Sequence, residues 1–214
     1  MSAMPDGGVV TALNNYTSID YDLVNDSIAF RFPIIRTDGA GDVIWSRTIS
    51  IHFGSLLSGD PYVYVDLSTD TSGRIFLLAG CSSFTPRQEF IACLDASGAL
   101  LWSRWIDDLA QGRYAGLVAA DQEGGCFAVW KREEVAPLQP VVNSQFDLCH
   151  LTSEGSLDWH RRGSLGYSGY TWISSIISLN DGVVVAGRGT NFVEPQGAFA
   201  FRAGSDGTLE WRAA

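Results

Sequence analysis

The chain has 214 residues, 46% of them hydrophobic and 18% charged, which is enough for one well-buried core and short for two. Its formal charge of −10 argues against nucleic acid as a partner, because binding to phosphates depends on a basic surface. The N-terminus lacks a basic region followed by an apolar stretch, and no window approaches the roughly 18 apolar residues of a membrane span. We therefore expect no membrane span and a protein that is cytoplasmic or part of an assembled particle.

The amino-acid composition favours an all-β fold. The chain has 23 glycines, 11 phenylalanines, 7 tryptophans and 7 tyrosines, as expected for many short strands joined by tight turns. The four cysteines lie far apart, without the CxxC spacing of a zinc site: Cys81, Cys93, Cys126 and Cys149. We interpret them as buried free thiols.

A turn followed by a strand recurs four times along the chain. In each copy a polar turn ends in glycine and a tryptophan follows four residues later, as in DASGALLW. The pairs in chain order are Gly41 and Trp45, Gly98 and Trp102, Gly155 and Trp159, and Gly207 and Trp211. The tryptophans are about 55 residues apart, close to the length of one propeller blade.

A second glycine turn alternates with the first, in PDGGVV, TSGRIF, QEGGCF and NDGVVV. Two tight turns in each period make two hairpins, hence four strands, A to D. The sequence thus predicts four blades within a single domain, at about residues 1–50, 60–107, 114–162 and 171–214. In the second blade we expect strands at residues 62–68, 74–79, 89–94 and 99–106, with Val63, Val65 and Leu67 on one face of the first.

The predicted fold is a β-propeller of four four-stranded antiparallel blades, because twisted sheets with two apolar faces bury both only against neighbouring sheets. The repeat tryptophans lie in the outermost strands, where we expect them to pack across the seam between blades. Arginines two residues later project on the same side of the strand: Arg47, Arg104 and Arg161. We interpret the repeat tryptophans and glycines as structural.

The D-x-x-G-x-x-x-W turns and the D-x-x-G-G strands resemble the repeats of quinoprotein-like and bacterial β-propeller repeat proteins. The resemblance covers nearly the whole chain and implies the architecture. It does not imply quinone chemistry, because quinone-dependent dehydrogenases of this type have about twice as many blades. We expect no cofactor and no metal.

The first blade leaves little chain for its innermost strand, only residues 1–4. A short inner strand leaves an edge open, and open strand edges pair readily with other chains. The alternative to a four-bladed ring is therefore half of an eight-bladed ring completed by a second chain, which makes a homo-oligomer through the incomplete first blade.

The connections between hairpins are long and fall at one end of the predicted blades, where rigid scaffolds usually carry binding residues. We expect these loops at residues 14–27, 50–61, 82–88, 107–114, 132–145, 162–171 and 188–197. Aromatic residues concentrate there: Tyr16, Tyr21, Tyr62, Tyr114, Tyr167, Tyr170 and Trp172. They are candidates for partner contact, because large amphipathic rings are common in binding surfaces. The alternative is that some of the tyrosines only cover the blade ends.

No catalytic motif stands out. His52, His150 and His160 fall in different repeats, without metal-binding spacing, and GYSGY lacks the spacing of a nucleophile elbow. We expect a non-catalytic binding or structural module that docks a protein, for instance as a subunit of a virion or a secretion machine. The alternatives are a carbohydrate-binding propeller and a hydrolase that uses loop carboxylates.

Overall fold

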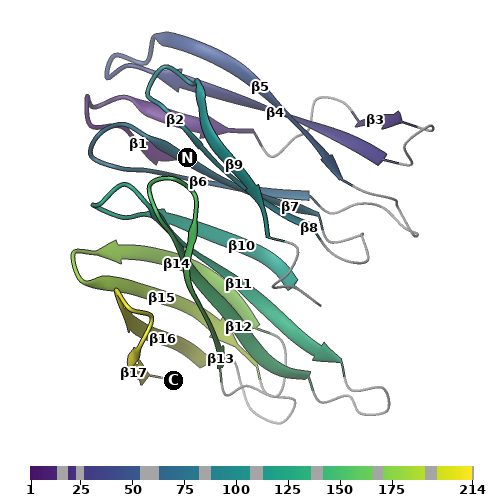
Figure 1. Ribbon diagram of the computed structural model, residues 1–214, viewed down its shortest axis with the longest axis vertical. Helices are drawn as coiled ribbons and strands as arrows, with labels where there is room; N and C mark the ends of the chain where they lie inside the picture. The colour runs from purple at the N-terminus through teal and green to yellow at the C-terminus, as the bar shows by residue number, and fades with distance from the viewer. Residues whose placement is uncertain are drawn as a thin grey trace. The chain divides into compact units, whose positions relative to one another are not determined.

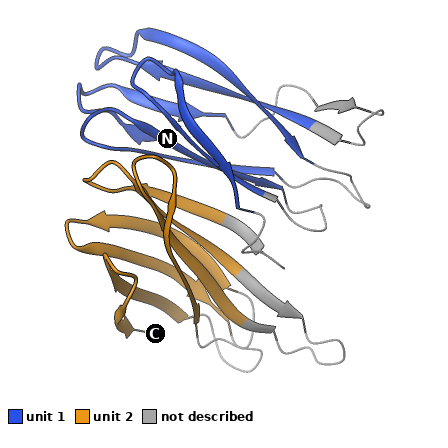
Figure 2. Cartoon of the chain, viewed as in Figure 1, with its two compact units in different colours: residues 1–111 blue, residues 112–214 orange. Residues whose placement is uncertain are grey.

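The computed structural model describes residues 1–13, 19–22, 27–53, 63–81, 88–106, 113–135, 142–165, 171–190 and 197–213, and every regular element in these ranges is a β-strand (Figure 1). The chain divides into two compact units, Met1–Gln111 and Gly112–Ala214 (Figure 2). Each unit contains two antiparallel sheets, which we call blades 1 and 2 and blades 3 and 4.

The strands of the first unit are β1 (Ser2–Ala3), β2 (Val9–Ala12), β3 (Ile19–Asp22), β4 (Ser27–Thr37), β5 (Val43–Phe53), β6 (Val63–Thr69), β7 (Ile75–Cys81), β8 (Gln88–Leu94) and β9 (Leu100–Trp105). Those of the second unit are β10 (Arg113–Ala120), β11 (Cys126–Val135), β12 (Val142–Leu151), β13 (Leu157–Ser164), β14 (Thr171–Leu179), β15 (Gly182–Gly189), β16 (Gly197–Gly204) and β17 (Leu209–Ala213).

Blades 2, 3 and 4 share one topology, in which four consecutive strands pair in sequence order, β6 to β9, β10 to β13 and β14 to β17. The predicted all-β fold with four-stranded antiparallel blades is confirmed. The strands expected in blade 2 agree with β6 to β9 within about two residues, the usual uncertainty of strand ends.

Blade 1 differs from the prediction in having a fifth strand. The core order is β1, β2, β4 and β5, and the short strand β3 pairs with the beginning of β4, in a segment that the sequence predicts as loop. The innermost strand β1 has only two residues, as expected. Strands β11 and β12 also extend into the predicted loop at residues 132–145, so that connection is shorter than expected.

Two kinds of tight turn lie at one end of each blade, between strands A and B and between strands C and D. We call this the turn end and the opposite end the loop end. Each of the eight turns has one glycine with positive φ: Gly7, Gly41, Gly73, Gly98, Gly124, Gly155, Gly182 and Gly207. The aspartate of the repeated motif stabilises the turn through its side chain. One carboxylate oxygen of Asp95 accepts hydrogen bonds from the amides of Ser97 and Ala99, at 2.8 and 3.0 Å.

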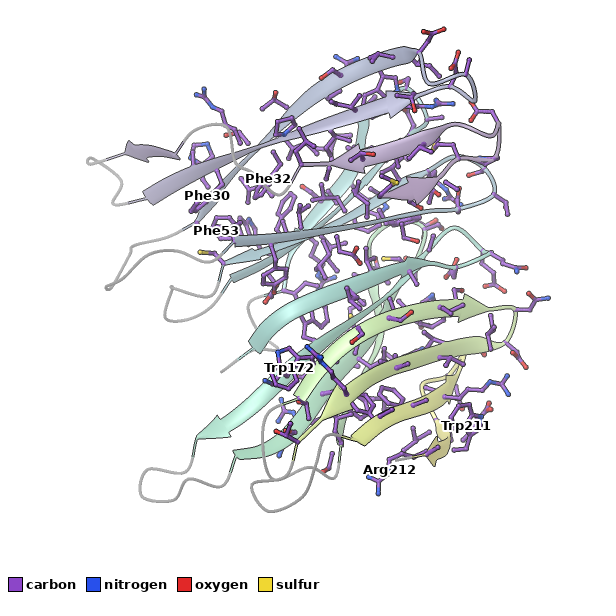
Figure 3. The ribbon with its side chains drawn as sticks, turned by 180° about the vertical axis from the view of Figure 1, so that it is seen from behind. Phe30, Phe32, Phe53, Trp172, Trp211 and Arg212 are labelled. Atoms are coloured by element: carbon purple, nitrogen blue, oxygen red, sulfur yellow. The ribbon has the colours of Figure 1, made fainter. Side chains whose placement is uncertain are left out.

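The core of the first unit lies between blades 1 and 2. Blade 1 contributes Phe30, Phe32 and Phe53, which Figure 3 shows on strands β4 and β5. Blade 2 contributes Val63 and Leu67, with Val65 partly buried against them, so the predicted inner face of strand A is confirmed. Facing sheets that each present alternate apolar residues exclude water, which stabilises the pair.

The core of the second unit lies between blades 3 and 4 and has the same construction. Phe127 and Val129 of β11 pack with Val185 of β15. Phe146 of β12 stacks on Phe201 of β16, with ring centroids 4.2 Å apart. These aromatic contacts add to the burial of apolar area.

A repeat tryptophan joins the two blades within each unit. In the first unit Trp45 Nε1 of blade 1 donates to the carbonyl of Ala96 in the C–D turn of blade 2, at 3.0 Å. In the second unit Trp159 Nε1 of blade 3 donates to the carbonyl of Ser205 in the C–D turn of blade 4, at 2.6 Å. The outer strand of one blade is thus fastened to the turn end of the next.

Candidate functional site

Most of the predicted binding residues at the loop end lie outside the residues that the structure describes. Tyr16, Tyr62, Tyr167 and Tyr170 belong to the connections that are not described. Tyr21 and Tyr114 lie on strands β3 and β10, and only their backbone is described. Trp172 is the one predicted binding residue whose side chain is described.

Trp172 lies near the beginning of β14, at the loop end of blade 4, and its side chain is 42% exposed (Figure 3). Arg188, its partner on β15, places its guanidinium carbon 5.0 Å from the centre of the indole ring. Lys131 of β11 places its ammonium nitrogen 5.9 Å from the same ring. We call these three side chains the Trp172 cluster. Of the two cations at this indole, Arg188 is exposed and Lys131 is buried, and both make cation–π contacts with the ring.

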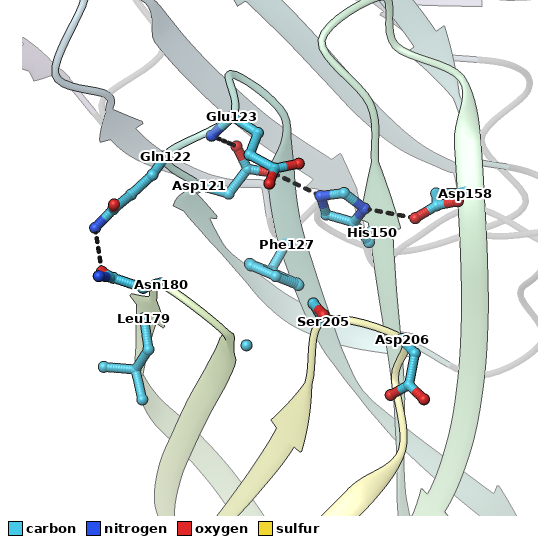
Figure 4. Close-up of a pocket in the computed structure, with 11 residues that line it drawn as sticks. Asp121, Gln122, Glu123, Phe127, His150, Asp158, Leu179, Asn180, Ser205 and Asp206 are labelled. Carbon is cyan, nitrogen blue, oxygen red and sulfur yellow. Dashed lines mark hydrogen bonds and ion pairs between the residues drawn. The ribbon is translucent and has the colours of Figure 1, made fainter.

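A second candidate site lies at the turn end of the same unit. It is a pocket of about 330 Å³, and His150 lies in its wall between two aspartates (Figure 4). His150 Nε2 is 2.6 Å from Asp121 and Nδ1 is 3.0 Å from Asp158. The imidazole also packs against Phe127 at a tilt, with ring centroids 4.8 Å apart.

The two carboxylates determine the ionisation of His150. Burial opposes the charged imidazolium, but the hydrogen bonds with Asp121 and Asp158 outweigh burial and raise the pKa of His150 above 6.5. Burial likewise opposes ionisation of Asp121. Its hydrogen bonds with His150 and with the amide of Gly125 outweigh burial, and the pKa of Asp121 falls below 3.8. The two carboxylates thus favour the protonated form of the imidazole.

This geometry suits His150 to holding strands together. A general base needs one ring nitrogen directed at its substrate, whereas both nitrogens of His150 are engaged by carboxylates. Asp121 also caps the A–B turn, where it accepts hydrogen bonds from the amides of Glu123 and Gly125. His150 therefore connects strand C of blade 3 to its A–B turn and to strand D.

The same clamp recurs in other blades. Arg36 of β4 pairs with Asp6, and Arg202 of β16 pairs with Asp181, at 2.6 Å. Each of these basic residues lies on strand C directly opposite a repeat tryptophan: Arg36 opposite Trp45, His150 opposite Trp159 and Arg202 opposite Trp211. The spacing between the histidines does not reveal this set, because its signal is a basic residue in the same place of three repeats.

Blade 2 is the exception, because Cys93 lies opposite Trp102 and the cation comes from the residue just before strand B. There Arg74 pairs with Asp70, at 2.7 Å. Burial raises the pKa of the Cys93 thiol to about 11, so it stays protonated at neutral pH. All four cysteines are buried free thiols, as expected.

A third hollow, of about 510 Å³, lies in the first unit along the outer strands of blades 1 and 2. Its walls include Ile49, Leu94, Leu100 and Trp105. Trp105 meets Phe53 and Phe90 edge to face, with centroids 5.5 and 5.2 Å away. This groove is mostly apolar and carries no constellation suited to catalysis among its described residues.

Among the described residues, no group of three or more histidine, cysteine or acidic side chains is placed to hold a metal ion. The part of the chain that the structure describes contains no helix long and apolar enough to cross a membrane.

Four antiparallel blades with repeated glycine turns define an all-β protein of the β-propeller class. No protein-family model matches the chain, and no curated protein sequence matches it. Among solved structures it is similar to a Synechocystis apocarotenoid oxygenase, with a TM-score of 0.51 and 10% identity over 95% of this chain and 45% of that one. The chain thus spans less than half of that oxygenase, and at this identity the likeness shows the fold alone.

Two further solved structures are similar at lower scores. One is a glycosyl hydrolase from Bacteroides ovatus, with a TM-score of 0.41 and 12% identity over 93% of this chain and 70% of that one. The other is an α-L-arabinofuranosidase from Clostridium thermocellum, with a TM-score of 0.39 and 10% identity over 91% and 70% of the two chains.

Proposed function

We propose that this propeller is a non-catalytic binding module that docks a protein partner at its loop end, through the Trp172 cluster. The observation that carries the proposal is an indole, 42% exposed, with Arg188 and Lys131 beside it. Tryptophan and arginine are the residue types that most often dominate the energy of protein interfaces. Repeat packing does not require Trp172, since it falls outside the Gly-to-Trp motif.

The charge of the cluster indicates the chemistry of the partner. Lys131 is the only lysine in a chain of charge −10, and it lies with Arg188 at this indole. Lys131 is only 8% exposed, so the exposed guanidinium of Arg188 is the cation that a partner can reach. A guanidinium beside an indole favours a carboxylate-bearing segment that also presents an apolar side chain to the ring. We therefore propose an acidic, aromatic or aliphatic peptide segment as the docked element.

The test is a selection of random peptides displayed on phage, with the purified chain as bait. We expect enriched peptides to combine acidic and large apolar residues, and Trp172→Ala to weaken their binding at least 10-fold by calorimetry. Ile177→Ala is the matched control, because Ile177 is an exposed apolar residue of the same strand. It should leave the affinity unchanged.

Three results would contradict the proposal. The first is equal loss of peptide binding in Ile177→Ala and Trp172→Ala. The second is binding of the chain to a glycan array that is lost in Trp172→Ala, which would indicate a carbohydrate-binding propeller. The third is turnover of chromogenic glycosides by the purified chain, abolished by a single Asp→Asn change, which would indicate a hydrolase.

A further inference from the structure

In the first unit, a guanidinium joins two turns at the turn end. Arg36 donates to the carboxylate of Asp6 in the A–B turn of its own blade, and to the carbonyl of Ala96 in the C–D turn of the next blade. The same carbonyl accepts the indole N–H of Trp45. The Arg36 side chain is only 13% exposed, so its guanidinium fills the space between the two turns.

The second unit has a shorter side chain in the place of Arg36. His150 lies opposite Trp159 in the same way as Arg36 lies opposite its own repeat tryptophan. The imidazole is held by two carboxylates of its own blade, and among the described residues it makes no hydrogen bond to blade 4. The pocket of about 330 Å³ lies beside it, and all the residues that line it belong to the second unit.

The A–B turn of the second unit offers the same carboxylate as that of the first. Asp6 lies two residues before Gly8, and the turn places that glycine against strand C. Glu123 lies two residues before Gly125, which meets strand C in the same way. Asp6 holds the Arg36 guanidinium. The Glu123 carboxylate lines the pocket and has no partner among the residues that the structure describes.

The C–D turn of blade 4 offers the same carbonyl. Ser205 holds the place of Ala96, and its carbonyl accepts the repeat indole N–H of Trp159. Ala96 also accepts from a guanidinium, whereas the Ser205 carbonyl accepts from no second side chain among those described. A carbonyl oxygen has two lone pairs, so Ser205 can accept another donor. Both units thus provide one carboxylate and one carbonyl, and only the first provides the guanidinium.

The rest of the lining suits a cation on an apolar stem. Four carboxylates line the pocket, those of Asp121, Glu123, Asp158 and Asp206. They outnumber the single histidine, so the potential in the pocket is negative even when His150 is charged. Phe127 lies in the middle of the pocket and Leu179 to one side of it, where they offer apolar surface to methylene groups (Figure 4).

We propose that this pocket binds a guanidinium group, carried by a free small molecule or by an arginine side chain. The guanidinium donates to Glu123 and to the carbonyl of Ser205, and its stem packs on Phe127. A planar fork can serve two acceptors on different turns, as Arg36 does, whereas an ammonium is a compact point charge. The site lies at the opposite end of the blades from the Trp172 cluster, so it is separate from the proposed docking of an acidic segment.

Titration of the purified chain with agmatine, a guanidinium on a four-carbon stem, tests the proposal. We expect saturable binding by calorimetry and a shift of the Trp159 indole N–H resonance in NMR spectra, because indole and ligand share the Ser205 carbonyl. Putrescine, which has the same stem and only ammonium groups, should bind about 10-fold or more weakly. The tripeptide Gly-Arg-Gly distinguishes the sources: binding like that of agmatine is expected of a pocket for arginine side chains, and binding of agmatine alone restricts the ligand to a free molecule.

Two variants test the acceptors and the space. Glu123→Gln should weaken agmatine binding about 10-fold or more, because it removes a charge-assisted hydrogen bond. Asp42→Asn is the matched control, since it removes one exposed carboxylate of a turn outside the pocket and should leave the affinity unchanged. His150→Arg should place the chain's own guanidinium in the pocket, as in the first unit, and exclude agmatine while unfolding remains cooperative.

Three results would overturn the proposal. The first is no saturable binding of agmatine to the wild type. The second is an equal loss of affinity in Glu123→Gln and Asp42→Asn, which would indicate general attraction to an acidic surface. The third is binding of putrescine as tightly as agmatine, which would show that the pocket does not recognise the guanidinium fork.

Discussion

At the scale of single residues, the indoles of Trp45 and Trp159 each join two neighbouring blades. Trp159 is nearly buried, contacts Phe127 and His150, and donates to the carbonyl of Ser205. Trp45 makes the equivalent contact with Ala96. In both units the hydrogen bond fixes the ring against a backbone carbonyl, so the side chain contributes direction as well as apolar area.

Removing the Trp159 indole should destabilise the second unit strongly. We expect Trp159→Ala to lower the free energy of unfolding by about 3–5 kcal/mol, and Trp159→Phe, which loses the N–H donor and part of the ring, by about 1–3 kcal/mol. Urea denaturation measures both. The control is Trp211→Phe, which should stay within about 0.5 kcal/mol because Trp211 is exposed. Equal losses at Trp159 and Trp211 would contradict the assignment of the seam.

His150 makes stability depend on pH. Its pKa is raised in the folded chain by Asp121 and Asp158, so its contribution is complete below the unfolded value of about 6.5 and is lost as pH rises through the folded pKa. The pKa of Asp121 is lowered, so its contribution is present above its unfolded value of 3.8 and is lost as pH falls through the folded pKa. The Asp121 and His150 pair therefore stabilises the second unit between these limits, with Glu123 and Asp206 as the other charged groups around the pocket.

The measurement is urea denaturation of the wild type and of His150→Gln from pH 5.5 to pH 9. We expect the free energy of unfolding of the wild type to fall as the pH rises through the range just above 6.5, and the slope to shrink in the variant. A titration of His150 followed by NMR should give a pKa above 6.5. A pKa at or below that value, or the same slope in both proteins, would contradict the clamp.

At the scale of elements, the A–B hairpin is set by a glycine that follows the turn. A Cβ added to Gly125 would come within 2.1 Å of the carbonyl of Leu151, and the corresponding distances are 2.1 Å from Gly8 to Thr37 and from Gly182 to Ala203. Strand C thus passes so close to the start of strand B that a side chain has no room. This contact explains why glycine occupies this place in three of the four blades, whereas blade 2 has Arg74 there.

Gly125→Ala should therefore lower the free energy of unfolding by about 1–3 kcal/mol, because strands B and C must move apart. Gly39→Ala is the control, since its Cβ would meet only ordinary contacts from 3.5 Å and its φ is not positive. It should change stability by less than about 0.5 kcal/mol. Thermal unfolding followed by circular dichroism measures both variants, and equal losses would contradict this account of the motif.

The hairpins could be predicted from the sequence because glycine turns and alternating strands are local signals. Strand β3 was missed because four residues, Ile19–Asp22, give no clear pattern and form a strand only by pairing with β4. Residues 132–135 read as loop because three of the four are charged, yet β11 continues through them in its ladder with β12. Local polarity says little about backbone pairing at the end of a long hairpin.

The two candidate sites also differ in how far the sequence predicts them. Trp172 could be predicted because an aromatic residue next to a long connection stands outside the repeat. The contacts of His150 could not be predicted from the sequence. Asp121 lies in a turn and His150 and Asp158 lie on two strands, so the register of the strands sets the distances between these side chains. Aligning the repeats on the tryptophans would have shown a cation in strand C of three blades, which is a signal present in the sequence.

At the scale of the whole molecule, each unit is a pair of blades with its own core and its own tryptophan seam. Changes in one core should therefore act on the stability of the unit that contains it, which the Trp159 and Gly125 variants test in the second unit.

The central claim is that an indole N–H of one blade is held by a turn carbonyl of the next. Hydrogen exchange of the indole N–H groups, followed by NMR with Trp→Phe variants for assignment, tests it most directly. The account predicts strong protection of the indole N–H groups of Trp45 and Trp159. Rapid exchange at these two groups would contradict it.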